Sequence, residues 1–174
     1  MNDDKTLLDS LAVEEAIQND ESYKFPYENY KIIGDTGEID RIINTCGVIN
    51  VDIIDITSTL STEADNYVTV GYAEGEGCIS NAFKDAVGKL PAGMESISKM
   101  LSNIWISKGV EQQGNEMSAL ADLIKCMSPD IDICWGFAWD ESLEGQQAKA
   151  TLIAVDVKAK ATSVMGNLTG LADF

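Results

Sequence analysis

Apolar residues recur at two different spacings along the chain, and the spacing changes repeatedly between residues 38 and 158. Apolar positions three and four apart are typical of one face of a helix and occur in 38–45, 52–60, 79–90 and 115–127. Runs rich in β-branched and aromatic residues are typical of strands and occupy 67–73, 101–107, 131–139 and 148–158. From residue 52 onward the predicted order is therefore helix, strand, helix, strand, helix, strand, strand.

This order predicts an α+β fold, a two-layer sandwich in which helices cover one face of a four-stranded mixed sheet. Because a polar turn with Gly145 separates 131–139 from 148–158, the last two strands are predicted to form an antiparallel pair. Five alternate residues of the first of these strands share one face, which we interpret as a face turned to the core. They are Ile131, Ile133, Trp135, Phe137 and Trp139.

The pattern divides the chain into three predicted parts. Residues 1–37 form an N-terminal arm, in which 2–20 has the spacing of a short amphipathic helix and 19–37 combines turn formers with four aromatic residues around Pro26. One interpretation is an extended arm laid over apolar surface, and the commoner one is that these aromatic residues simply pack onto the main core. Residues 38–158 form the α+β domain, and 159–174 form a small, polar, then mildly apolar tail.

Composition narrows the classes of function. The 174 residues are 45% hydrophobic, enough to bury a core, and carry a formal net charge of −17. Such acidity argues against nucleic acid or an anionic membrane surface as a partner. The sequence has no leader pattern, and no apolar run approaches the roughly 20 residues of a membrane span. We therefore expect a soluble cytoplasmic protein.

The sequence lacks the commonest general base, histidine, and the common zinc-binding and nucleotide-binding motifs. There is no histidine, and Cys46, Cys78, Cys126 and Cys134 contain no C-x-x-C spacing, so neither a zinc site nor a histidine-activated nucleophile is expected. No Walker-type or dinucleotide-binding glycine motif is present. The sequence predicts no metal, no cofactor and no self-contained enzyme.

The stretch from Gly47 to Thr57 holds the candidate site residues Asn50, Asp52 and Asp55 within an apolar run. If a helix begins near Asp52, both carboxylates lie on its first turn, where they can act as N-cap and capping box. That structural interpretation is the commoner one for such acids. A functional interpretation needs support from the rest of the chain.

Three stretches, in order, resemble the C-terminal domain of the tubulin/FtsZ superfamily, specifically of bacterial cell-division FtsZ. Residues 48–56 resemble its synergy loop and the following helix, 72–77 the next strand and the start of a helix, and 132–155 the final two strands. The resemblance covers about 38–158. It lacks the GTP-binding half, and residues 1–37 have no counterpart in the family.

The resemblance implies that Asn50, Asp52 and Asp55 cross a longitudinal subunit contact and complete the GTP site of a neighbour in trans, so that GTP and Mg²⁺ enter only through a partner. Two hypotheses follow. In the first, the chain is a non-enzymatic module that docks this loop on an FtsZ-like GTPase, or on itself, in cell division or cytoskeletal regulation. In the second, the domain is reused for self-association or small-molecule binding and the acids are only caps. A split or truncated FtsZ is a further possibility.

Overall fold

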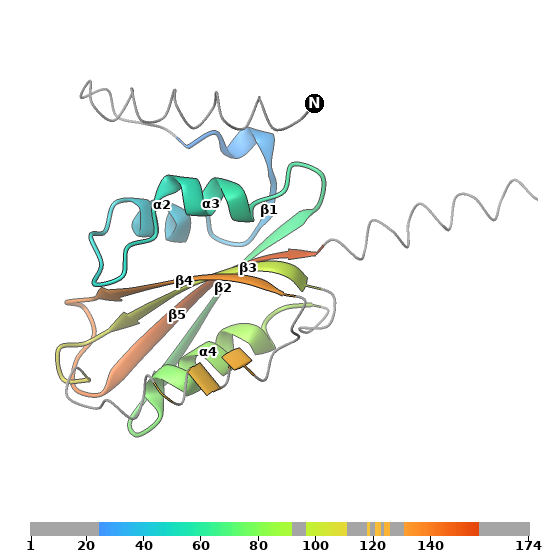
Figure 1. Ribbon diagram of the computed structural model, residues 1–174. Coiled ribbons are helices and arrows are strands. Elements are labelled where there is room, and N and C mark those ends of the chain that lie inside the picture. Colours follow the sequence, from blue (N-terminus) through green and yellow to red (C-terminus); the bar gives the residue numbers. More distant parts are fainter. Residues whose placement is uncertain are drawn as a thin grey trace, which may run out of the picture.

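The computed structural model describes residues 25–91, 97–110 and 131–156, and five helical positions (118, 121, 122, 124 and 125) of the helix predicted at 115–127 (Figure 1). The helix predicted at 2–20, the rest of the helix at 115–127 and the tail at 159–174 lie outside the described residues. The boundaries proposed for the arm, the domain and the tail remain predictions.

The described residues form a five-stranded mixed sheet with the order β1-β2-β5-β3-β4. Its strands are β1 (Lys31–Ile33), β2 (Asp65–Glu74), β3 (Ile97–Ile106), β4 (Asp132–Trp139) and β5 (Gln147–Asp156). Strand β1 runs parallel to β2 and β4 parallel to β3, whereas β5 is antiparallel to both of its neighbours. The predicted α+β class and mixed sheet are confirmed. The sheet has five strands, not four, because three residues of the N-terminal arm pair with β2.

The predicted antiparallel pairing of the last two strands is wrong. Strand β5 lies between β2 and β3, and β4 is the edge strand on the far side of β3. The connection through Gly145 crosses the end of β3, where the Ser107 N–H donates to Gln147 O at 3.2 Å and the Asp140 N–H donates to Ile106 O at 2.9 Å. The central place of β5 agrees with its burial, because residues 148–155 are buried throughout, as in a strand covered on both faces.

Helices pack on both faces of the sheet, which corrects the prediction of helices on one face (Figure 1). Helix α4 (Cys78–Gly88) covers one face, and its Ile79 and Phe83 pack with Met100 and Leu152. Helices α2 (Gly37–Ile43) and α3 (Ile53–Thr59) cover the other, where Ile39 and Ile56 pack with Leu101, Trp105 and Ile153. Alternate residues of β3 and β5 therefore face opposite sides of the sheet and belong to two separate hydrophobic cores. A sheet with helices on one face would have only one such core.

The described part of the arm completes the core on the α2 and α3 side. Phe25 is 5% exposed within this core, and its ring lies 4.9 Å from that of Tyr27 and 5.8 Å from that of Tyr30, centroid to centroid. The Tyr27 hydroxyl, in the short 3-10 helix η1 (Tyr27–Asn29), donates to the carboxylate of Asp40 on α2. Phe25 thus packs into the main core, and the residues directly after Pro26 form a short helix and not an extended segment.

Candidate functional site

The loop between α2 and α3 is fixed to the outer edge of β4. Phe137 donates its N–H to Ile49 O at 2.9 Å, and Phe137 O accepts from Val48 N at 2.7 Å and from Ile49 N at 3.1 Å. Ile49 and Phe137 thereby form an isolated antiparallel bridge. Although the loop lies at the surface, its backbone is held at the edge of the sheet.

Two glycines make this close approach possible. A Cβ atom on Gly47 would lie 2.6 Å from Phe137 O, and one on Gly136 would lie 2.4 Å from a methyl group of Val51. Both distances are shorter than real Cβ contacts allow. Glycine is therefore required on each side of the contact between loop and strand.

Asp52 and Asp55 form the capping box that their spacing predicts. The Asp52 carboxylate accepts from Ile54 N at 2.8 Å and from Asp55 N at 2.9 Å, and the Asp55 carboxylate accepts from Asp52 N at 3.0 Å. These bonds satisfy N–H groups that the first turn of a helix leaves without partners. The structural interpretation of the two acids is thus observed directly.

Asn50 has a local bond too, because its side-chain oxygen accepts from Gly47 N at 2.6 Å. Asn50 and Asp52 are exposed and Asp55 is half-buried, so all three predicted site residues lie on one short surface segment. Within the described residues, the Asn50 amide nitrogen and the second Asp52 oxygen have no hydrogen-bond partner. Local hydrogen bonds therefore hold these three side chains in place, but some of their polar atoms keep no partner among the described residues.

Apolar side chains surround these polar groups. Val48 is 61% exposed, Ile54 41% and Ile49 39%. We call Val48, Ile49, Asn50, Asp52 and Ile54 the loop surface. The three exposed apolar residues lie within seven positions and surround the polar groups of this segment.

Cys134 on β4 lies beside the loop surface, close to Asp52 and Asp55. The sequence did not indicate this proximity, because Cys134 is far from both acids along the chain. Burial is the main factor that raises the pKa of its thiol, to about 11, followed by the charge of Asp55, a hydrogen bond to Asp55 and the charges of Asp52 and Asp132. A thiol held in its neutral form is a poor nucleophile. Cys134 is therefore part of the packing under α3 and is not a reactive group.

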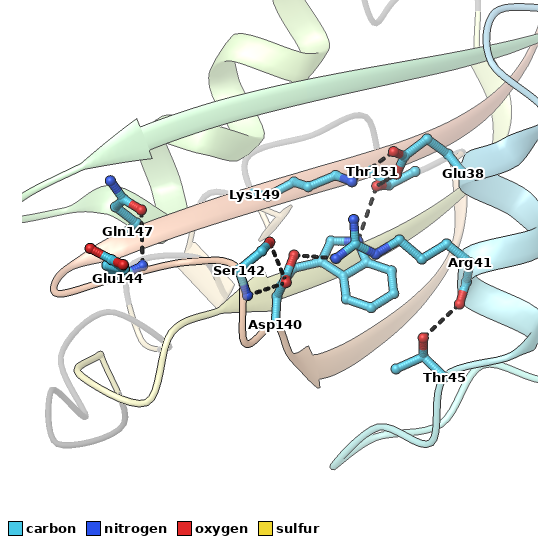
Figure 2. A network of polar contacts seen from close by, with 10 residues as sticks. Glu38, Arg41, Thr45, Asp140, Ser142, Glu144, Gln147, Lys149 and Thr151 are labelled. Carbon is cyan, nitrogen blue, oxygen red and sulfur yellow. Dashed lines mark hydrogen bonds and ion pairs between the residues drawn. The ribbon is translucent and has the colours of Figure 1, made fainter.

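A network of polar contacts joins α2 to the sheet, and the sequence interpretation missed it (Figure 2). The Lys149 ammonium, on a side chain 2% exposed, lies 2.7 Å from one Glu38 oxygen, and the Thr151 hydroxyl donates to the other oxygen at 2.8 Å. Trp105 Nε1 donates to the Thr151 hydroxyl at 3.1 Å. One helix and two strands thus share a buried ion pair.

A second ion pair lies next to the first. Arg41 of α2 contacts the carboxylate of Asp140, whose side chain is 4% exposed, and the Arg41 guanidinium lies 4.8 Å from the centre of the Trp105 ring. Burial works to raise the pKa of Asp140, but hydrogen bonds from Ser142 and the charges of Arg41 and Lys149 outweigh it and lower the pKa. The only sign of this network in the sequence was Lys149 within the apolar run 148–155, because a lysine is almost never buried without a partner for its charge.

No group of three or more acidic or cysteine side chains within the described residues is arranged to hold a metal ion. Among the helices that the structure describes, none is long and apolar enough to span a membrane.

Comparison with solved structures defines the fold. An empty FtsZ dimer from M. jannaschii matches 70% of this chain with a TM-score of 0.56 at 20% identity, and a tryptophan-to-tyrosine mutant of that FtsZ matches 70% with a TM-score of 0.57 at 18% identity. The matches cover 35% and 36% of the solved chains. The described domain therefore has the fold of an FtsZ/tubulin C-terminal domain.

The sequence comparison finds a relative of the same name. Over 111 residues, or 62% of this chain, the sequence is 28% identical to the cell division protein FtsZ of Porphyromonas gingivalis. The match covers 24% of that protein, so the chain spans about a quarter of the length of this relative. No family model matches the sequence. The resemblance to FtsZ that the motifs predicted is confirmed, over part of FtsZ only.

Proposed function

We propose that this chain is an interaction module, not an enzyme on its own, that docks its loop surface on the nucleotide-binding face of an FtsZ-like GTPase. The observation that carries the proposal is the ordered loop surface itself. Exposed Val48, Ile49 and Ile54 surround two acids and an amide, and backbone hydrogen bonds to Phe137 hold this loop at the edge of the sheet. The similarity to FtsZ supports a role in cell division or a related cytoskeletal process.

The proposed chemistry at the contact belongs to the partner. Placing a water in line with a γ-phosphate is a large share of phosphoryl-transfer catalysis, and carboxylates can do this without histidine. Asp52 and Asp55 supply carboxylates, and Asn50 supplies an amide nitrogen free to donate. Acids beside a phosphate need a cation to offset their repulsion. The partner would therefore bring GTP and Mg²⁺, and this chain would complete its site in trans.

Small-molecule binding has less support from the structure. A cavity of about 210 Å³ is lined by Lys108, Trp139, Asp140, Glu141 and Leu143. Ligand pockets usually measure about 300–1,000 Å³ and enclose most of their ligand. This cavity is smaller than that range, and it lies away from the predicted site residues.

Co-sedimentation tests docking. The chain is mixed at equimolar ratio with FtsZ of the same organism and GTP, and we expect it to pellet with filaments or to shorten them. Val48→Asp places a charge in the loop surface and should abolish the effect. The matched control is Ile33→Asp on β1, which is 42% exposed at the opposite edge of the sheet. If the unmodified chain neither pellets with filaments nor changes their length, the proposal is wrong.

Asparagine variants test the role of the acids separately. Asn caps helices about as well as Asp, so Asp52→Asn with Asp55→Asn keeps much of the capping while removing both charges. We expect docking to persist and GTP turnover at the contacted site to fall at least tenfold. Unchanged turnover with full docking would mean that the two acids serve only as caps.

A further inference from the structure

The outward-facing main-chain groups of β2 are covered at successive positions along the strand. Strand β1 pairs with residues 65–67 of β2. Beyond β1, the Tyr72 N–H donates to the Asp85 carboxylate at 3.0 Å, and the Lys89 ammonium donates to Val70 O at 2.6 Å. A side chain of α4 and one of its C-cap residue therefore occupy main-chain groups that would otherwise pair with another strand. Such covering is how soluble sheets prevent unwanted strand addition.

The opposite edge is covered only in part. The main-chain groups of Phe137 point away from β3, where the loop residues Val48 and Ile49 bind them. Main-chain groups alternate in direction along a strand, so those of Ile133 and Trp135 point outward as well. In the described ranges, no backbone hydrogen bond reaches either residue on this side. We call residues 132–135 of β4 the open edge.

The surroundings of the open edge are apolar and negatively charged. The Trp135 side chain is 38% exposed, and the bridge at Ile49 marks the end where the open edge stops. Asp132 is exposed on the open edge itself, and the carboxylates of Asp52 and Asp55 lie close enough to act on Cys134. An incoming strand would therefore meet unpaired N–H and C=O groups, an exposed indole ring and three acids.

We propose that the open edge binds an extended, basic segment of another protein by strand addition. Main-chain hydrogen bonds to Ile133 and Trp135 would supply affinity, and alternate side chains would supply specificity. The charge selects the occupant: lysine or arginine side chains would face Asp132, Asp52 and Asp55, whereas a second copy of this chain, with net charge −17, would bring like charges together. This proposal does not depend on docking of the loop surface, although both sites include Asp52.

Amide hydrogen exchange by NMR tests the open edge first. In the free protein the amides of Ile133 and Trp135 should exchange quickly, because they face solvent. The amides of Cys134 and Gly136 face β3 and should be protected. The probe is a blocked seven-residue peptide that alternates lysine and valine, added at up to about 1 mM, a range that detects weak binding. Binding should slow exchange at Ile133 and Trp135.

Two N-methylated isomers of the peptide separate strand addition from attraction between charges. One carries N-methyl groups on every lysine and the other on every valine, so composition and charge are identical. Only one of the two sets of N–H groups can face β4 in an added strand. We expect one isomer to bind at least tenfold more weakly and the other to bind within about twofold of the unmodified peptide.

Charge variants complete the test. Asp132→Asn should weaken binding about two- to threefold and reduce its dependence on salt, whereas Glu74→Gln, an exposed acid on β2, should leave it unchanged. The proposal is overturned if the peptide does not bind at about 1 mM, if it binds without protecting Ile133 and Trp135, or if both N-methylated isomers bind alike.

Discussion

Removal of one member of the buried Glu38–Lys149 pair should destabilise the domain more than any surface substitution. The two charged atoms are 2.7 Å apart, and the side chains are 15% and 2% exposed. Glu38→Gln leaves a buried ammonium without its carboxylate. Lys149→Met leaves a carboxylate with only the Thr151 hydroxyl as a donor. Breaking a buried pair from one side typically costs about 3–5 kcal/mol.

The expected loss is a large fraction of the total free energy of unfolding of the domain. Domains are typically stable by about 5–15 kcal/mol, and for a chain of this size each kcal/mol shifts the melting temperature by roughly 2–4 °C. Glu38→Gln should therefore lower the melting temperature by roughly 6–20 °C. The charge of Asp140, which already interacts with Lys149, should keep the loss toward the lower end of that range. Circular dichroism during thermal and urea unfolding measures both quantities.

The double variant provides the decisive comparison. Glu38→Leu with Lys149→Met removes both charges together, so it should recover much of the loss, because hydrophobic replacements of buried pairs are often neutral. Lys31→Met is the matched control, since Lys31 pairs with Asp65 at the surface with a side chain 71% exposed, and it should cost less than about 1 kcal/mol. If the single variants cost no more than this control, or if the double variant loses the sum of both singles, the reasoning is refuted.

Three further predictions concern the candidate site and its surroundings. Asp52→Ala should lower the free energy of unfolding by roughly 0.5–2 kcal/mol in urea titration, because it removes the cap of α3; no change would contradict the capping role. At a pKa of about 11, only about 0.1% of the Cys134 thiol is ionised at pH 8, and the side chain is half-buried whereas Cys46 is exposed; mass spectrometry after iodoacetamide treatment should therefore find Cys46 alkylated long before Cys134. Since the folded-state pKa of Asp140 is lowered, its contribution is present above the unfolded pKa of about 3.9 and is lost as pH falls through the folded value; stability measured between pH 5 and 2 should therefore fall less steeply in Asp140→Asn.

Features of the fold that depend on neighbouring residues were predictable. The capping box follows from Asp52 and Asp55 at their spacing, and α4 follows from apolar residues three and four apart that stop before Pro91. The strand positions also follow, because β-branched and aromatic residues mark them locally. Each of these signals lies within a dozen residues. The candidate site was accessible from sequence for the same reason, because Asn50, Asp52 and Asp55 lie on one segment.

Features that depend on distant residues were not predictable in this way. The sequence predicts a strand at 148–158, but not that β5 lies between β2 and β3, because pairing partners are chosen by packing on both faces. Strand β1 has only three residues, too few for a periodic signal. Glu38 and Lys149 are 111 positions apart, so each could be recognised as unusual but not as part of a pair. Cys134 likewise meets Asp55 only in the folded chain.

The polar network and the loop surface are connected through α2. Helix α2 ends at Ile43, and the loop that presents Asn50 and Asp52 begins directly after it. The start of that loop is fixed by Glu38 and Arg41, which hold α2 to β5 and to the segment after β4. The middle of the loop is fixed by Phe137 on β4, which binds Val48 and Ile49. The loop is therefore anchored to the sheet at its start and in its middle by contacts within the described domain. This anchoring means that Glu38→Gln should weaken filament binding beyond its effect on the folded fraction, which distinguishes an anchored loop from one that merely lies nearby.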